Sequence, residues 1–496
     1  MPALTRKLLD GSFRFPPEIE LPAYPANLPE RVVQFGEGNF LRAFVDWMFQ
    51  RLNNSGLWSG SVVVVQPIAD GLADRLAAQD GLYTLILRGL QDGRPVEEMS
   101  LVGAVSRALS AYDDWDEVLK CAENPTIEYL VSNTTEAGIA HNPGDTIAMT
   151  PPVSFPAKVT AYLYRRFCHF GGDSAKGMVI IPCELTDRNG DLLKQVVLRY
   201  AAEWRLPAAF AAWVEKDNFF LNTLVDRVVT GYPKDEAAAF AARLGYQDAL
   251  LDTGELFHLW VIEGPARVAE KLPFTRIGLN VIWTDDMTPY RTRKVRILNG
   301  SHTASVPTAF LCGIETVGEM MDHPVVGQFV RQAIYDEIVP AVDLDKKMLR
   351  TFADAVVERF QNPYIRHYLT SILLNSAAKF KVRVLPSILD HQRRFGRLPA
   401  RLVFGLAALI AVYKKPGVMR DDQPVLDLMA AAWGGYDGSD AGARRVVDTV
   451  LANRAAWGED LTAVPGLAAI TAGYLQSICR DGAPAAVAAL LAENRA

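Results

Sequence analysis

A buried strand, a glycine turn and an amphipathic helix follow one another near the start of the chain. Residues 31–35 (RVVQF) are mostly apolar and β-branched, and Gly36-Glu37-Gly38 follows them directly. From Asn39 the apolar residues recur with the period of a helix, at Phe40, Phe44, Trp47, Met48 and Leu52. This order favours folds in which a parallel strand passes straight into a helix. A glycine pair at such a turn lets the backbone approach a pyrophosphate at the helix N-terminus.

Other strand and helix patterns alternate along the first half of the chain. Residues 61–66 (SVVVVQ) form a continuous apolar run that Pro67 ends, which suits a parallel sheet covered on both faces. The alternation predicts a doubly wound α/β domain, with the proline-rich first thirty residues as an arm over it. The further expected strands are 83–87, 127–131 and 178–181, and the expected helices include 114–121 and 157–167.

Strand patterns fade after about Pro273, and long helical patterns replace them. The length of 496 residues fits two or three domains. We therefore predict an α/β fold with a Rossmann-like doubly wound sheet domain over 1–280 and a mostly α-helical domain over 281–496. The expected helices of the second domain are 293–311, 326–338, 345–360, 364–378, 400–413, 439–456 and an alanine-rich tail from Gly466.

Charge and cysteine usage exclude several classes of protein. The chain has 51 basic and 57 acidic residues, a net charge of −6 that argues against a nucleic-acid partner. Its 5 cysteines are scattered and never form a CxxC pair, so neither a disulfide framework nor a cysteine zinc site is expected. Residues 402–413 form the longest apolar stretch, too short for a membrane span of roughly 18 residues. With no signal-peptide pattern at the start, we expect a cytoplasmic protein without a membrane partner.

The glycine turn predicts a dinucleotide site, although Leu41 stands where the third glycine of GxGxxG belongs. A tight turn without a ligand is the alternative. An acidic residue near the end of the second strand binds the adenosine ribose in NAD enzymes, and Asp70 is the candidate, with Asp74 less favoured. No arginine lies within 66–70, which favours NAD, while Arg75 leaves NADP open. The predicted cofactor residues of this region are Val33, Gln34, Phe35, Gly36, Glu37, Gly38, Asn39, Phe40, Leu41, Arg42 and Asp70.

A second informative segment lies at 293–302. On an α-helix Lys294, Leu298 and His302 would share one stripe, with Asn299 at its side. A lysine, an amide and an imidazole that converge on one point can move a proton and polarise a carbonyl without a metal. The alternative is a solvated lysine beside a structural histidine. Because no histidine pair has HExxH-like spacing, we expect no metal.

Seven segments, in the same order along the chain, resemble the long-chain polyol dehydrogenase family, also called the mannitol dehydrogenase family. They are QFGEGNFLRAFVDW at 34–47, QDGLYT at 79–84, SNTTEAGI at 132–139, IIPCEL at 180–185, NTLVDRVVTGYP at 222–233, KVRILNGSHTA at 294–304 and RFQNPYIRH at 359–367. The resemblance implies two domains and NAD-dependent hydride transfer at a CH–OH group.

The resemblance also implies roles for single residues. Lys294 is expected to be the general acid/base, while Asn299 and His302 hold and polarise the reacting oxygen. Ser132, Asn133, Thr134 and Glu136 are expected near the nicotinamide. The residues expected to form the substrate pocket are Glu184, Val225, Asp226, Arg291, Arg366, His367 and Lys379.

Three departures set this chain apart from the polyol enzymes. The run Cys183-Glu184-Leu185 lacks the second catalytic asparagine, for which Glu184 or Asn189 are possible substitutes. A family arginine appears as Ser371, with Arg366 and His367 nearby, and a carboxylate three residues before the lysine is replaced by Arg291. An added cation suits a substrate that carries a carboxylate, so we expect Arg291 or Arg366 to bind a keto-uronate.

The resemblance, together with this added cation, implies the reversible, NAD-dependent reduction of a small-molecule keto-uronate, tagaturonate, in hexuronate catabolism. Its epimer fructuronate is the nearest alternative, and a mannitol-type polyol substrate is the next. A non-catalytic NAD(H)-binding sensor is the alternative from another class. We expect a monomer or a small homo-oligomer.

Overall fold

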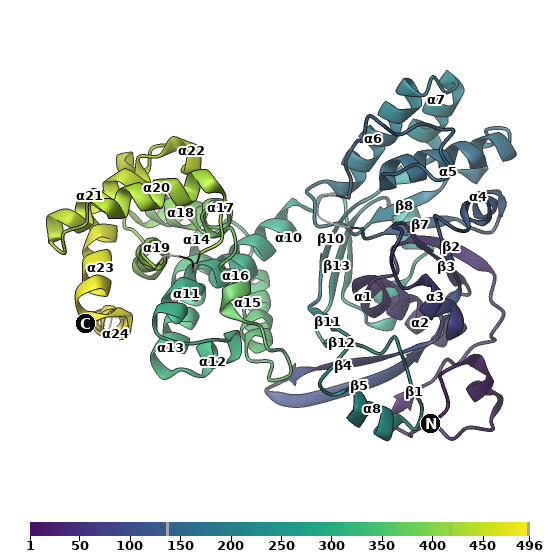
Figure 1. The fold of residues 1–496 in the computed structure, drawn as a ribbon, viewed down its shortest axis with the longest axis horizontal. Helices are drawn as coiled ribbons and strands as arrows, with labels where there is room; N and C mark the ends of the chain where they lie inside the picture. The colour runs from purple at the N-terminus through teal and green to yellow at the C-terminus, as the bar shows by residue number, and fades with distance from the viewer. Residues whose placement is uncertain (135–137, 416, 418, 494–496) are drawn as a thin grey trace. The chain divides into compact units, whose positions relative to one another are not determined.

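The computed structural model describes residues 1–134, 138–415, 417 and 419–493. Contacts between α-carbons divide the chain into two compact units (Figure 1). Unit 1 comprises Met1–Gly89 and Pro95–Met287, and unit 2 comprises Leu90–Arg94 and Thr288–Ala496. That 1–280 and 281–496 serve as separate functional domains stays a prediction.

Unit 1 contains a six-stranded sheet in the order β6-β3-β2-β7-β8-β9. Every neighbouring pair is parallel, and the strand order reverses between β2 and β7. Doubly wound sheets bind their ligands at the carboxyl ends of the strands beside such a reversal. The predicted Rossmann-like class is therefore confirmed. The strands are β2 (Glu30–Phe35), β3 (Ser61–Gln66), β6 (Val105–Ser110), β7 (Tyr129–Ser132), β8 (Val179–Pro182) and β9 (Phe219–Phe220).

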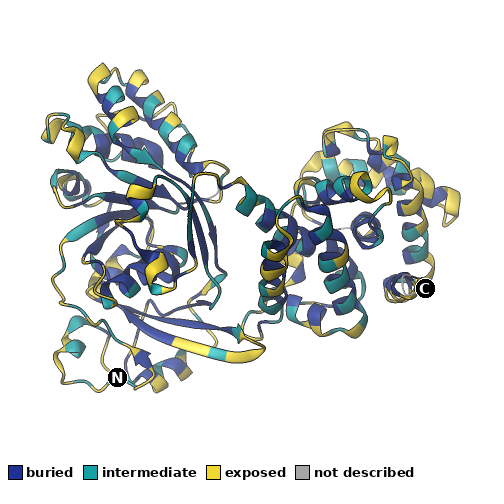
Figure 2. Cartoon of the chain, turned by 180° about the vertical axis from the view of Figure 1, so that it is seen from behind, coloured by how far each residue is buried: buried dark blue, intermediate teal, exposed yellow. Residues whose placement is uncertain are grey.

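Alternate side chains of each central strand enter two different cores. In β3, Val62 and Val64 belong to one buried cluster and Val63 and Val65 to another. Figure 2 shows the central strands of this sheet as buried. Both faces are covered, which explains the unbroken valine run. The helices are α1 (Asn39–Leu41), η2 (Arg42–Asp46), α2 (Trp47–Asn54), α3 (Ala73–Ala78), α4 (Trp115–Glu123), α5 (Phe155–His169), α6 (Asn189–Glu203) and α7 (Ala208–Asp217).

Unit 1 also contains two smaller sheets that the sequence patterns do not predict. A five-stranded sheet has the order β1-β5-β4-β12-β11, and a three-stranded sheet has the order β10-β13-β14. The strand expected at 83–87 is β4 of the five-stranded sheet, and the N-terminal arm contributes β1. Their elements are β1 (Ile19–Glu20), β4 (Tyr83–Gln91), β5 (Arg94–Val102), β10 (Asn222–Asp226), β11 (Val229–Gly231), α8 (Ala237–Leu244), β12 (Asp252–Glu255), β13 (Leu259–Glu263) and β14 (Val281–Thr284).

Unit 2 is helical. The expected helix over 364–378 is wrong, because Asn375 has a left-handed φ of 51° and separates two short helices. The apolar run expected as a buried helix is α19, whose residues 401–412 are all buried. The principal helices are α10 (Thr288–Arg293), η5 (Lys294–Asn299), α11 (Gly300–Leu311), α13 (Pro324–Gln332), α15 (Lys346–Phe360), α16 (Leu369–Ile372), α17 (Ser376–Arg383), α18 (Leu385–Phe395), α19 (Ala400–Val412), α20 (Gln423–Gly434), α21 (Asp440–Leu451), α23 (Leu467–Asp481) and α24 (Ala483–Glu493).

Among the described residues, no helix combines the length and the apolar character that crossing a membrane requires.

Candidate functional site

The two glycines of the turn after β2 have different surroundings. Gly36 has a φ of 123°, and a Cβ added there would lie 2.8 Å from the carbonyl oxygen of Asn133. Only glycine fits this backbone. Gly38 has an ordinary φ of −66° and provides no side-chain cap for α1. A Cβ added at Gly38 would meet nothing within 4 Å, so the backbone there is open to a ligand. This arrangement fits a pyrophosphate bound at the helix N-terminus.

The helix that follows contains a π-helical segment, η2, over Arg42–Asp46. A π-turn changes the pairing of backbone carbonyls, and side-chain donors bind two of them here. The Tyr83 hydroxyl donates to the carbonyl of Arg42 at 2.8 Å, and the Arg227 guanidinium donates to that of Ala43 at 2.6 Å. Burial lowers the pKa of Arg227 to about 9. Both donors fall within the family-like segments 79–84 and 222–233, but sequence reasoning assigned neither of them a role.

Arg42, predicted to bind the cofactor, is buried and its guanidinium bonds within unit 1. It donates to the carbonyl of Leu250 and to the side chain of Asn39, and it lies 3.5 Å from Asp252. Its guanidinium therefore stabilises the glycine turn by linking Asn39 to Leu250.

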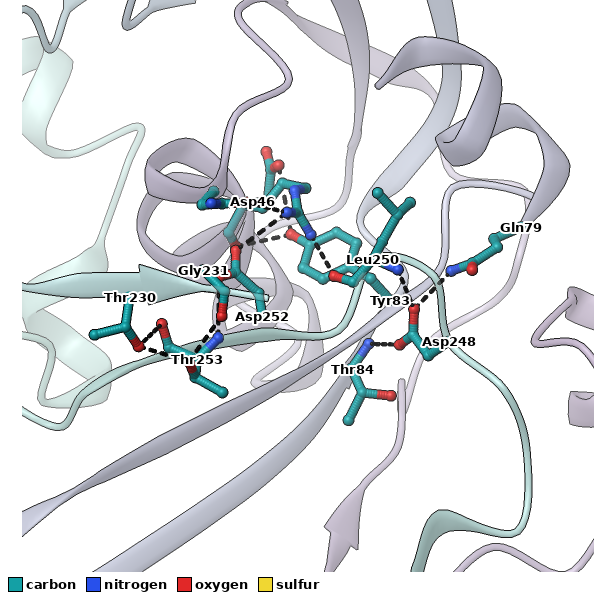
Figure 3. A network of polar contacts seen from close by, with 12 residues as sticks. Asp46, Gln79, Tyr83, Thr84, Thr230, Gly231, Asp248, Leu250, Asp252 and Thr253 are labelled. Carbon is teal, nitrogen blue, oxygen red and sulfur yellow. Dashed lines mark hydrogen bonds and ion pairs between the residues drawn. The ribbon is translucent and has the colours of Figure 1, made fainter. Parts of the chain in front are cut away.

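The carboxylates around Arg42 form a buried polar network that continues to Asp248 (Figure 3). Burial raises the pKa of Asp46 and that of Asp252 to about 7. The Gln34 amide donates to the carbonyl of Gly36 at 3.1 Å and to Asp46 at 3.2 Å, which connects this network to the glycine turn. Sequence reasoning missed Asp46 and Asp252, because single acidic residues in apolar segments form no motif.

The remaining predicted residues of this region divide by burial. Val33, Phe35 and Leu41 have side chains in the cores of unit 1. Phe40 is half-buried and its ring stacks on Phe44 at 5.0 Å. Only their backbone, or the exposed part of Phe40, remains for a cofactor.

Asp70 is exposed in the loop between β3 and α3. Gln66 holds this loop in place, because its side-chain amide donates to the carbonyls of Ile68 and Ala69 at 2.9 and 3.0 Å. The side-chain oxygen of Gln66 accepts from the backbone N–H of Ala73 at 3.0 Å. Glu37 reaches the same loop, and its carboxylate lies beside Gly71. Burial raises the pKa of Glu37.

The loops after β7 and β8 are joined by Glu184, which is fully buried. Its carboxylate accepts from the Ser132 hydroxyl at 3.0 Å and from the backbone and hydroxyl of Thr134 at 3.1 and 3.2 Å. The Asn133 amide donates to the carbonyl of Cys183 at 2.6 Å. Burial raises the pKa of Glu184. Glu184, predicted for the substrate, thus contacts the loop predicted for the cofactor, while Glu136 lies outside the described residues.

Asn189 is buried and its amide is used within the fold. It donates to the carbonyls of Pro182 and Glu184 at 3.0 and 3.1 Å and accepts from the backbone of Thr223 at 2.9 Å. Both ends of the Asn189 amide are thus used in joining β8, its following loop and β10. Val225 is 3% exposed and part of the core, and Asp226 is buried at the end of β10.

In unit 2, Lys294 and Asn299 lie at the two ends of the π-helical segment η5, and His302 lies one turn later in α11. A π-turn hydrogen-bonds residues five apart, so Asn299 lies nearer to Lys294 around the helix than it would in an α-helix. The regular α-helix expected here is interrupted by this turn, and Leu298 is buried at 8% exposure. All three predicted catalytic side chains are half-buried.

His302 and His367 come together although they are far apart in sequence. The His302 ring stacks on Phe360 at 3.9 Å, and the His367 ring stands edge-on to it at 5.5 Å. Burial lowers the pKa of His367 and so disfavours the charged form of its ring. Lys379 donates to the carbonyl of Ile372 at 3.1 Å.

The two arginines predicted to bind a carboxylate, Arg291 and Arg366, are both exposed. Within the described residues, no group of three or more histidine, cysteine or acidic side chains is arranged to hold a metal ion.

Two family models match the chain. The mannitol dehydrogenase Rossmann domain matches residues 30–276, and the mannitol dehydrogenase C-terminal domain matches residues 286–479.

Similar proteins include the altronate oxidoreductases of Cronobacter sakazakii and Yersinia enterocolitica. The first is 51% identical over 93% of this chain and 97% of its own length, and the second is 49% identical over the same shares. Among solved structures, a Pseudomonas fluorescens mannitol 2-dehydrogenase complex with NAD and D-mannitol has a TM-score of 0.72 at 24% identity, covering 99% of both chains. A substrate-free D-sorbitol dehydrogenase has a TM-score of 0.80 at 22% identity, covering 98% of this chain and 100% of that one. The chain therefore belongs to the mannitol dehydrogenase family and is an oxidoreductase that acts on CH–OH groups.

Proposed function

We propose that this chain catalyses the reversible, NAD-dependent reduction of D-tagaturonate to D-altronate. The observation that carries the proposal is the 51% identity to an altronate oxidoreductase over 93% of the chain. The epimeric keto-uronate, fructuronate, is the nearest alternative substrate, because it carries the same carboxylate that Arg291 or Arg366 would bind.

The cofactor is NAD. The open backbone at Gly38, the uncapped helix N-terminus and the exposed Asp70 after β3 support this assignment. In the similar mannitol 2-dehydrogenase structure the bound dinucleotide is NAD. NAD, when bound, supplies or accepts the hydride of the reaction.

Lys294 donates the proton that completes reduction and accepts it in the reverse direction. Asn299 and His302 hold the ketone oxygen by donating hydrogen bonds to it, which stabilises the negative charge that develops there. The ring of His302 is oriented by its stacking on Phe360. A ketone, one hydride and one proton give one alcohol, so the reaction balances without a metal.

Arg291 or Arg366 binds the carboxylate of the sugar acid, since a guanidinium pairs with a carboxylate through two parallel hydrogen bonds. His367, Lys379, Val225 and Asp226 complete the proposed substrate pocket, and Glu136 the nicotinamide region. Glu184 contributes to the proposed pocket indirectly, because its carboxylate holds Ser132 and Thr134 of the loop after β7.

In the cell the enzyme acts in hexuronate catabolism in the cytoplasm, on a small-molecule substrate, as a monomer or small homo-oligomer. The net charge of −6 supports the absence of a nucleic-acid partner. No membrane partner is proposed.

The test is NADH oxidation with tagaturonate, fructuronate and fructose in parallel. We expect the largest kcat/KM with tagaturonate and the smallest with fructose. A larger value with fructuronate would reassign the substrate, and a larger value with fructose would return the enzyme to the polyol class. NADH binding without turnover of any of the three would favour a non-catalytic sensor.

A further inference from the structure

The second strand of the six-stranded sheet, β3, ends in Gln66 and not in an acidic residue. Its amide bonds to Ile68, Ala69 and Ala73, so the side chain is used in shaping the loop of residues 67–72, here called the ribose loop. In dinucleotide-binding domains an acidic residue at this place contacts the adenosine ribose and distinguishes NAD from NADP. Asp70 is acidic but exposed, and it lies four residues beyond the strand end.

Glu37 brings a second carboxylate to the ribose loop from the glycine turn. A Cβ added at Gly71 would lie 2.2 Å from the Glu37 carboxylate oxygen and 2.5 Å from the Gln66 side chain. Glu37 is 7% exposed, and the backbone N–H groups of Glu37 and Leu72 hydrogen-bond to its carboxylate. The carboxylate is thus fixed between the loop and the end of β3.

The charged side chains around this carboxylate include cations as well as anions. Arg42 is the cation whose charge acts on Glu37, but its guanidinium is turned to Asn39, Leu250 and Asp252. The exposed neighbours along the loop and the first turn of α3 are Asp70, Asp74 and Arg75.

We propose that Glu37 is the residue that selects NAD over NADP, by placing a fixed negative charge under the ribose loop where a 2′-phosphate would lie. Asp70 then accepts a hydrogen bond from the ribose hydroxyl on the exposed side of the loop. Glu37 affects cofactor selectivity through its charge and through the position of the loop. A 2′-phosphate carries nearly two negative charges at neutral pH, whereas a ribose hydroxyl carries none. The carboxylate therefore disfavours NADP much more than NAD.

The inference rests on the proposed use of NAD and is independent of the sugar substrate. It is tested by binding alone. Dissociation constants for NADH, NADPH, ADP and 2′,5′-ADP are measured at about pH 8 by calorimetry, on the full chain. The variant is Glu37→Gln, which keeps the shape and removes the charge, and the matched control is Glu215→Gln, which removes an exposed charge from α7.

We expect Glu37→Gln to bind NADPH and 2′,5′-ADP roughly tenfold more tightly, which is the size of effect that one partly screened charge produces. The affinities for NADH and ADP should change less than about twofold, and Glu215→Gln should change all four affinities little. Gly71→Ala, whose methyl group displaces the Glu37 carboxylate, should shift selectivity in the same direction if Glu37→Gln does not fold.

If Glu37→Gln bound NADH and NADPH more weakly by the same factor, Glu37 would have only a structural role, which would overturn the inference. An unchanged ratio of the NADPH and NADH affinities, or an equal shift in Glu215→Gln, would overturn it as well. A wild-type chain that binds neither dinucleotide would instead overturn the proposed cofactor, and the inference with it.

Discussion

The carboxylate of Glu184 accepts a hydrogen bond from the backbone N–H of Thr134 at 3.1 Å. This contact joins the carboxyl ends of β7 and β8 beside the point where the strand order reverses. Between its two partners, Ser132 and Thr134, lies Asn133, whose carbonyl oxygen limits Gly36 to a glycine. Glu184 therefore supports the glycine turn through the loop that it holds.

The Glu184→Gln variant should bind NADH about tenfold more weakly, because a hydrogen bond to a charged acceptor is worth about 1.5–3 kcal/mol and one carboxylate oxygen becomes a donor. Titration of NADH fluorescence measures this. Glu215→Gln, an exposed position on α7, is the matched control and should bind as the wild type does. Wild-type affinity in Glu184→Gln would show that the loop is held by other contacts.

The two glycines of the turn should respond differently to alanine. Gly36→Ala places a methyl group against Asn133 at a φ of 123°, and we expect a loss of about 1–3 kcal/mol in unfolding free energy. Gly38→Ala has space and an ordinary φ, so its stability should change by less than about 1 kcal/mol while NADH binding falls. Chemical denaturation and NADH titration check both variants. If Gly38→Ala kept full NADH affinity, the pyrophosphate would have to lie elsewhere.

Asp46 should make stability fall as pH rises towards neutrality. Burial raises its pKa from 3.8 to about 7, so between these values the folded protein holds a proton that the unfolded chain has released. The effect of this group is absent at acid pH and complete above its folded pKa. We expect Asp46→Asn to remove a slope of up to about 1.4 kcal/mol per pH unit between about pH 5 and 7.

Denaturant unfolding of the wild type and of Asp46→Asn at about pH 5, 6 and 7 checks this. The asparagine of this variant retains an oxygen that accepts from the Gln34 amide. The charge of Arg42, which acts on both carboxylates in the wild type, then acts only on Asp252 of this pair. Two stability curves that run parallel over this pH range would contradict the account.

Lys294→Ala should lose turnover and keep its cofactor. General acid–base catalysis contributes about 10²–10⁴-fold, so kcat should fall by that factor while the dissociation constant for NADH stays within about twofold. Steady-state assays and NADH titration measure the two quantities. Unchanged turnover near neutral pH would remove Lys294 from the mechanism.

Arg291→Ala and Arg366→Ala separate the two candidate carboxylate-binding residues. Replacing the arginine that contacts the sugar acid should raise KM for tagaturonate about 10–100-fold, since a charged hydrogen bond is lost. The same variant should leave the weak reaction with fructose unaltered. Parallel kinetics with the two substrates provide the comparison. If both variants kept the wild-type kcat/KM for tagaturonate, neither arginine would bind the substrate carboxylate.

The strand, turn and helix at 30–54 are predictable because valine runs and apolar spacing are local properties of the sequence. The π-helical turns are not, since they depend on distant donors such as Tyr83 and Arg227 that bind the backbone of Arg42 and Ala43. The same limit applies at Lys294, where the sequence predicts a regular α-helix and the structure has a π-turn over Lys294–Asn299.

The two smaller sheets of unit 1 could not be predicted from patterns either. Their strands pair residues far apart in sequence, such as Leu85 with Asp252 and Ile19 with Met99. Local signals give the residues at the ends of β2, β3 and β7, but not the use of Asn189 inside the fold or the contact of Glu37 with Gly71. Both depend on three-dimensional neighbours.

In the proposed reaction a hydride passes directly from NADH to the ketone carbon of a keto-uronate. The most direct measurement is the reduction of tagaturonate with NADH deuterated at C4 on either face, with mass spectrometry of the product. We expect altronate with one deuterium on the new carbinol carbon from one of the two labelled cofactors. Altronate without deuterium from both cofactors, or no altronate at all, would contradict it.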